Sequence, residues 1–149
     1  MKKEEKNKIN KDILDEINKG CVMGMDAIRD ILDKVEDKKF KKVLEKEFDK
    51  YKDIHHRILK KYEDYSKEEP TTTSILNKTM TSIMTEMKLM KDNSNSKIAE
   101  LLSQGTNMGI IEGKKLLNHK EKIDKTVEKI LKDFIEMQEE SIEIYKEYL

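Results

Sequence analysis

Two glycine-punctuated segments of similar sequence lie 85 residues apart in an otherwise helix-forming chain. The first is GCVMGMDAIRDIL at residues 20–32, and the second is GTNMGIIEGKKLL at residues 105–117. Five positions coincide at this offset: two glycines, one methionine and the last two apolar residues. Such a repeat indicates one structural unit used twice. We therefore expect a chain built from two similar halves, with these segments at matching places.

The apolar residues of four long segments recur in steps of three and four, which is the pattern of helix faces that pack in a bundle. Helices are predicted from about residue 5–10 to 35, and over residues 40–65, 98–119 and 127–148. Short polar corners at 36–38 and 120–122 make each successive pair a hairpin. The inward positions are predicted to be Leu14, Ile17, Cys21, Gly24, Ile28, Ile31 and Val35; Phe40, Leu44, Phe48, Tyr51, His55, Ile58, Tyr62 and Tyr65; Ile98, Leu102, Gly105, Gly109, Glu112, Leu116 and His119; Val127, Leu131, Phe134, Gln138, Ser141, Tyr145 and Tyr148.

A shorter, methionine-rich helix is predicted between the hairpins. The only proline, Pro70, and the polar run 92–96 mark its limits, residues 71–74 offer N-caps, and its end is expected near Lys91. A connection of this length can cross the bundle, so the second and fourth long helices should run parallel. We expect one all-α domain: hairpin 8–66, crossover 67–95 and hairpin 96–149. The apolar stripe of the crossover, which we expect to lie against the bundle or else to bind a partner, is Leu76, Met80, Ile83, Met84, Met87 and Met90.

Charge and composition exclude several classes of function. The 31 basic and 31 acidic residues cancel, so the chain lacks the positive field needed to bind nucleic acid or an anionic membrane. Mean hydropathy is −0.85, and no segment approaches the roughly 20 apolar residues of a membrane span. The single cysteine, Cys21, permits no internal disulfide and is predicted to be buried. With no signal-peptide pattern at the start, we predict a cytoplasmic protein.

Several short motifs resemble a little-characterised family of small ferritin-like four-helix bundles from spore-forming bacteria. They are MGMD at 23–26, VED at 35–37, YKD at 51–53, IAE at 98–100, MGII at 108–111 and the ending YKEYL. The resemblance covers most of the chain. It implies a ferritin-like bundle of two pseudo-repeated hairpins with a helical crossover, and a role in stress or sporulation.

A ferritin-like di-iron site needs inward carboxylates and histidines from all four helices near the bundle middle. The predicted middle positions are Gly24, Tyr51, Gly109 and Gln138, none of which is a carboxylate or an imidazole. We therefore predict no metal and no other cofactor. The remaining metal candidates are Glu112, the one acid at an inward position, and His55; with atypical ligands of this kind, iron stays the alternative.

The glycines point to an unusual centre, because each glycine inside a helix costs about 1 kcal/mol relative to alanine. Gly20 and Gly24 lie one turn apart, as do Gly105 and Gly109. Our preferred interpretation is close packing, with Tyr51 and Gln138 filling the space. The alternative is a small-ligand pocket lined by Met23, Met108, Tyr51 and Glu112. Both interpretations use the same residues: Gly20, Gly24, Tyr51, Gly105, Gly109, Glu112 and Gln138.

Three functional hypotheses follow. The leading one is a non-catalytic ferritin-like bundle that binds a protein partner or associates with itself. The second is an iron-binding protein or di-iron oxidoreductase of the ferritin or rubrerythrin type, and the third is a small-ligand binder at the glycine-lined centre. No Ser-His-Asp order and no glycine-rich phosphate loop is present, so we do not expect nucleophilic catalysis or nucleotide binding.

Overall fold

The computed structural model describes residues 2–71, 78–118 and 122–149. These residues form five helices and no strand, which confirms the all-α prediction for the described part of the chain. The helices are α1 (Lys3–Leu32), α2 (Lys38–Tyr62), α3 (Lys78–Leu89), α4 (Asn95–Leu117) and α5 (Lys125–Lys146). None of them is both long and apolar enough to cross a bilayer.

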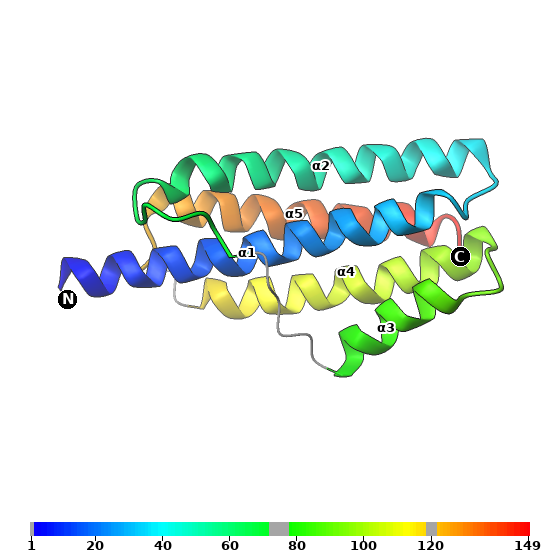
Figure 1. Ribbon diagram of the computed structural model, residues 1–149. Coiled ribbons are helices and arrows are strands. Elements are labelled where there is room, and N and C mark those ends of the chain that lie inside the picture. Colours follow the sequence, from blue (N-terminus) through cyan, green and yellow to red (C-terminus); the bar gives the residue numbers. More distant parts are fainter. Residues whose placement is uncertain (1, 72–77, 119–121) are drawn as a thin grey trace.

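The four long helices lie side by side as two antiparallel hairpins, α1–α2 and α4–α5 (Figure 1). Helix α3, which connects the hairpins in sequence, runs back along the outside of the bundle, so α2 and α4 point in the same direction, as expected from the length of the connection. Helix α2 also packs against α5, while α3 lies against α4 and α1. The crossover is thus part of the bundle, and its Ile83 and Met87 are buried.

The predicted stripe of α1 is confirmed, since all of its apolar members are buried. On α2, two of the predicted inward positions are wrong. The buried residues there follow strict steps of three and four through Glu47 and Ile54, whereas Phe48 and His55 are only partly buried. The helical period is therefore maintained, and it places the acidic residue Glu47 on the buried face. Phe48 instead packs at the edge, where the guanidinium of Arg29 lies 5.5 Å from the centre of its ring.

Polar caps fix the starts of two helices. The Asp37 carboxylate accepts hydrogen bonds from the N–H groups of Lys39 and Phe40 at the start of α2, and these bonds hold its pKa below the usual value. The Ser94 hydroxyl accepts from Lys97 N–H at the start of α4. Helix α3 begins at Lys78 and ends at Leu89, two residues before the predicted end. The predicted caps at 72–74, Leu76 and His119 lie outside the described residues.

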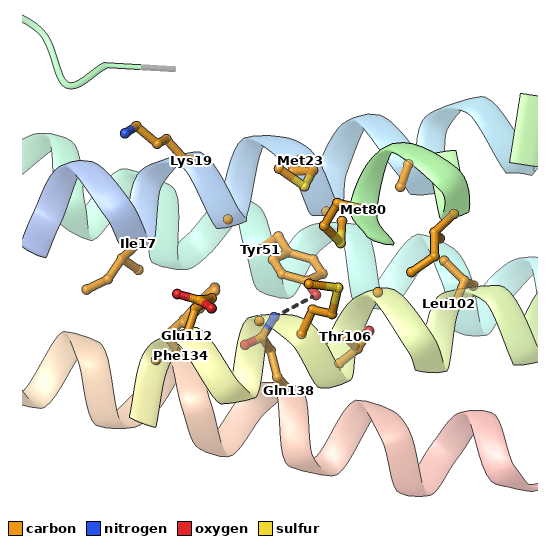
Figure 2. Close-up of a pocket in the computed structure, with 18 of the residues that line it drawn as sticks. Ile17, Lys19, Met23, Tyr51, Met80, Leu102, Thr106, Glu112, Phe134 and Gln138 are labelled. Carbon is orange, nitrogen blue, oxygen red and sulfur yellow. Dashed lines mark hydrogen bonds between the residues drawn. The ribbon is translucent and has the colours of Figure 1, made fainter. Parts of the chain in front are cut away.

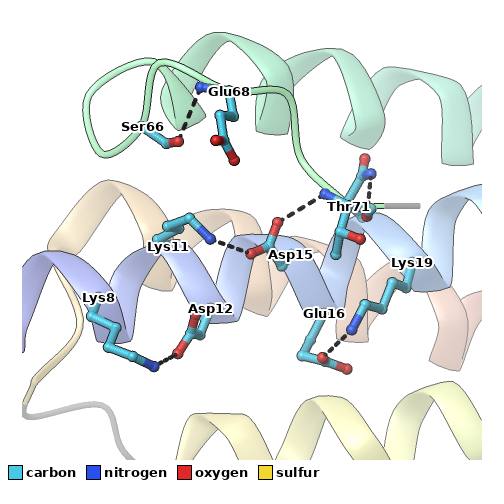
Figure 3. A network of polar contacts seen from close by, with 10 residues as sticks. Lys8, Lys11, Asp12, Asp15, Glu16, Lys19, Ser66, Glu68 and Thr71 are labelled. Carbon is cyan, nitrogen blue, oxygen red and sulfur yellow. Dashed lines mark hydrogen bonds and ion pairs between the residues drawn. The ribbon is translucent and has the colours of Figure 1, made fainter. Parts of the chain in front are cut away.

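Helix α1 holds both ends of the crossover connection. Near one end, Asp15 accepts from the Thr71 N–H at 3.0 Å (Figure 3), and the Asn18 amide donates to the Thr71 carbonyl at 3.2 Å. At the other end, the Lys34 ammonium donates to the carbonyl of Met87 at 2.6 Å. Asn93 in turn donates to the carbonyl of Lys34 at 2.9 Å. These bonds satisfy backbone groups that would otherwise lack partners, and they keep α3 against α1.

A third polar contact joins α1 to the corner between α4 and α5. Asn10 is fully buried, and its amide donates to the carbonyls of Lys6 at 2.8 Å and Lys122 at 3.4 Å. Its Oδ1 accepts from the Asp124 N–H at 2.8 Å. Asp124 also pairs with Lys6 at 2.9 Å and accepts from the Tyr65 hydroxyl, so one polar cluster closes this end of the bundle.

Candidate functional site

A cavity of about 290 Å³ lies between α1 and α4 (Figure 2). Tyr51 from α2 and Phe134, Gln138 and Tyr145 from α5 form its floor, and α3 covers one end. Its walls are mainly apolar and rich in methionine. The apolar wall residues are Ile17, Met23, Ala27, Ile28, Met80, Ile83, Met84, Met87, Leu102, Met108 and Leu116.

All five glycines of the chain line this cavity. At four of them a methyl group would collide with a side chain. A Cβ at Gly24 would lie 2.7 Å from the Tyr51 ring, and one at Gly109 would lie 2.2 Å from the Gln138 amide nitrogen. Tyr51 and Gln138 thus occupy the space beside these two glycines. Two side chains of α5 pack against the other two glycines in the same way. A Cβ at Gly20 would lie 2.9 Å from Phe134, and a Cβ at Gly113 would lie 2.7 Å from Ile135.

Gly105 differs from the other four glycines. A Cβ built there meets no atom of the described residues within 4 Å. Gly105 therefore faces the open part of the cavity, although it matches Gly20 in the sequence repeat. Close packing accounts for four glycines, and the fifth borders empty space.

The floor carries the polar groups of the cavity. The Gln138 amide nitrogen donates to the Tyr51 hydroxyl at 3.4 Å, so one residue from each hairpin meets the other at the centre (Figure 2). Thr106 of α4 is buried beside them. Burial raises the pKa of Tyr51 to about 12, against the opposing effect of hydrogen bonds from Gln138 and Thr106. Tyr51 therefore stays a neutral hydrogen-bonding group.

Charged residues lie only at the rim. Glu16 and Lys19 form an ion pair of 2.7 Å on α1, and Glu112 pairs with Lys115 at 3.4 Å on α4. The prediction that Glu112 faces inward is wrong: its side chain is 61% exposed. Gly113 takes the buried position, because its lack of a side chain lets α4 approach Ile135. Glu112 still borders the cavity, at the end away from α3 (Figure 2).

His55 belongs to a different part of the molecule. Its Nδ1 lies 2.6 Å from Asn18 Oδ1, and since the Asn18 amide nitrogen already donates to Thr71, the imidazole is the donor. Burial, and then the neighbouring charge of His56, hold the pKa of His55 below its usual value. His55 is therefore a partly buried, hydrogen-bonded residue of α2. The structure does not bring His55 together with Glu112.

The described residues do not assemble the donor set of a di-iron site. They contain no group of three or more histidine, cysteine, aspartate or glutamate side chains placed to hold a metal ion. The central residues are Tyr51, Gln138 and two glycines, as predicted. Cys21 is buried, and burial raises the pKa of its thiol, which opposes formation of a thiolate ligand.

Sequence reasoning missed two buried carboxylates, Asp15 on α1, which is hydrogen-bonded to Thr71, and Glu47 on α2, which is 1% exposed. Glu47 is the more deeply buried. Its Oε2 pairs with Lys50 at 2.6 Å, and Oε1 has no hydrogen-bond partner among the described residues. Glu47 does not line the cavity. The signal that would have found it is the strict step from Leu44 through 47 to Tyr51.

The predicted site residues are thus brought together. Gly20, Gly24, Tyr51, Gly105, Gly109, Glu112 and Gln138 all border the same cavity. So do Met23 and Met108, together with three methionines of α3 that sequence analysis assigned to packing against the bundle. No known protein family, curated protein or solved structure shows significant similarity to this chain.

Proposed function

We propose that this protein is a non-catalytic helical bundle that acts by binding, and that its ligand is a small, largely apolar molecule held between α1 and α4. The observation that carries the proposal is the open space at Gly105, inside a cavity that every glycine of the chain borders. Protein cores are normally filled, so a glycine that no side chain compensates favours a site over simple packing.

The size and lining of the cavity define the ligand class. An engineered apolar cavity of about 150 Å³ binds benzene. At about 290 Å³, this one has room for a molecule of roughly two fused rings. Apolar walls with a few convergent polar groups are typical of small-molecule sites. Methionine side chains adapt to ligands of different shape, so the methionines of α1, α3 and α4 favour a site that tolerates variation.

We also propose that the fold is ferritin-like. Two antiparallel hairpins, a helical crossover and the parallel course of α2 and α4 support this. The alternative of an iron-binding or di-iron protein has little support in the described side chains, because the candidates Glu112 and His55 lie apart and the bundle centre presents an amide and a phenol.

Fluorescence of N-phenyl-1-naphthylamine, which increases when the dye leaves water, tests the proposal. The wild-type protein should bind the dye saturably. Gly105→Leu should weaken binding at least tenfold, because its Cβ meets no described atom within 4 Å and the rest of the side chain extends into the space of the ligand. Gln104→Leu is the matched control, since it adds the same side chain at the neighbouring exposed position of α4 and should leave binding unchanged. Absence of saturable binding by wild type, or equal binding by Gly105→Leu, would refute the proposal.

Association with a protein partner or a second copy of the chain is the second candidate function. The favouring observation is Leu89 at the end of α3, which is 73% exposed. Sedimentation of wild type and Leu89→Lys across a concentration series tests it. If wild type self-associates and Leu89→Lys does not, this candidate is supported. If both proteins are monomers, self-association is refuted.

A further inference from the structure

Among the described residues, three buried side-chain atoms lack a hydrogen-bond partner: Glu47 Oε1, Ser103 Oγ and Gln138 Oε1. Only Gln138 lines the cavity. It is 3% exposed, and its one hydrogen bond is the donation from the amide nitrogen to the Tyr51 hydroxyl (Figure 2). An acceptor buried without a partner is costly, and native proteins rarely leave one unsatisfied.

We propose that the ligand carries a hydroxyl or N–H group that donates to Gln138 Oε1, with its apolar body against the methionine walls. This inference rests on the proposed function, because it names the chemistry of the ligand that the cavity binds. It separates the expected ligands from plain hydrocarbons, which would fill the cavity and leave the acceptor unpaired.

The geometry of the amide allows this pairing. The last side-chain torsion of glutamine is soft, so the amide can turn at small cost. Its bond to Tyr51 is long at 3.4 Å and resists such a turn weakly. The amide occupies the space that a Cβ at Gly109 would take, since a methyl group there would lie 2.2 Å from Nε2 and 2.8 Å from Oε1. The glycine therefore permits an amide at this point of the floor.

The experiment compares 2-naphthol with naphthalene, which has the same ring system without the donor. Each compound displaces N-phenyl-1-naphthylamine from wild type and from Gln138→Met, whose side chain has a similar shape without the amide. In wild type, 2-naphthol should bind at least as tightly as naphthalene, because the hydroxyl finds an acceptor. In Gln138→Met the ratio of the two dissociation constants should shift about tenfold against 2-naphthol, since a buried hydroxyl without a partner is unfavourable.

Comparing the ratio of dissociation constants in wild type with the ratio in Gln138→Met cancels the difference in hydration free energy between the two compounds. 2-Methoxynaphthalene, which can only accept, should show no such shift between the two proteins. An unchanged ratio for 2-naphthol would overturn the inference and would point to an ordered water at Oε1 instead, while naphthalene binding would still support the cavity as a site. If neither compound nor the dye binds, the proposed function itself fails.

Discussion

Gly105→Ala should stabilise the protein, although it replaces one of the five glycines that line the cavity. Gly105 lies inside α4, where alanine is favoured over glycine by about 1 kcal/mol. The added methyl group meets no described atom within 4 Å, so no packing cost opposes this gain. We expect the free energy of unfolding to rise by about 1 kcal/mol and the melting temperature by about 3 °C for a chain of this size.

Gly24→Ala is the matched comparison, because it makes the same change inside α1. Here the added carbon would lie 2.7 to 2.8 Å from three atoms of the buried Tyr51 ring, which is rigid and must move as a whole. Overpacking of this kind costs about 1–3 kcal/mol, against the same gain of about 1 kcal/mol in helix propensity. The variant should therefore be no more stable than wild type and up to about 2 kcal/mol less stable.

Urea unfolding followed by the helical circular-dichroism signal measures both variants, and equal slopes would show that only stability has changed. The two variants should differ by about 1–3 kcal/mol, with Gly105→Ala the more stable. If Gly105→Ala lowers the stability, or if both substitutions change it by the same amount, the distinction between a filled and an open glycine is wrong.

Three further outcomes test other parts of the structure. Asn10→Ala should lower the free energy of unfolding by about 2 kcal/mol, because it leaves the Asp124 N–H without its acceptor and removes the side-chain donor to the Lys6 and Lys122 carbonyls. Lys8→Ala in urea unfolding is the exposed control. The pKa of His55 is lower in the folded protein than in the unfolded chain, so the neutral imidazole contributes fully to stability above about pH 6.5. This contribution is lost as the pH falls through the pKa of the folded state. Wild type should therefore lose more melting temperature than His55→Gln between about pH 7.5 and 5, and parallel losses would contradict this. Burial raises the pKa of the Cys21 thiol, so a disulfide reagent should label it only after unfolding, and rapid labelling of folded protein would contradict its burial.

The sequence predicts which glycine lies opposite which larger residue in each hairpin, because the glycines occur at matching positions of the repeat. Gly24 opposite Tyr51 and Gly109 opposite Gln138 are the same arrangement in the two halves. The errors arose where the apolar signal was ambiguous. On α2, the apolar Phe48 is the residue that hydrophobicity predicts to be inward, yet the helical step from Leu44 to Tyr51 buries Glu47 instead.

The cavity itself could not be derived from the pattern. Glycines mark places where a helix has no side chain, but the pattern does not say whether a neighbour fills the gap. Gly20 and Gly105 are equivalent in the repeat, and only the packing of α5 and α3 around them distinguishes the filled position from the open one. The outward position of Glu112 has the same origin, since glycines at 105, 109 and 113 left α4 with little apolar signal to fix its rotation.

The contact between Asn10 and the corner at Lys122 and Asp124 has a consequence for how the protein is made. Asn10 lies on α1, whereas Lys122 and Asp124 follow α4 in the sequence, 112 and 114 residues later. The α1–α2 hairpin therefore has its apolar face uncovered until α4 and α5 have been synthesised. A nascent chain that stops before α5 contains α1 and α4 but lacks the floor residues Phe134, Gln138 and Tyr145. We thus expect the bundle and its site to be completed together, in one step that follows the synthesis of α5.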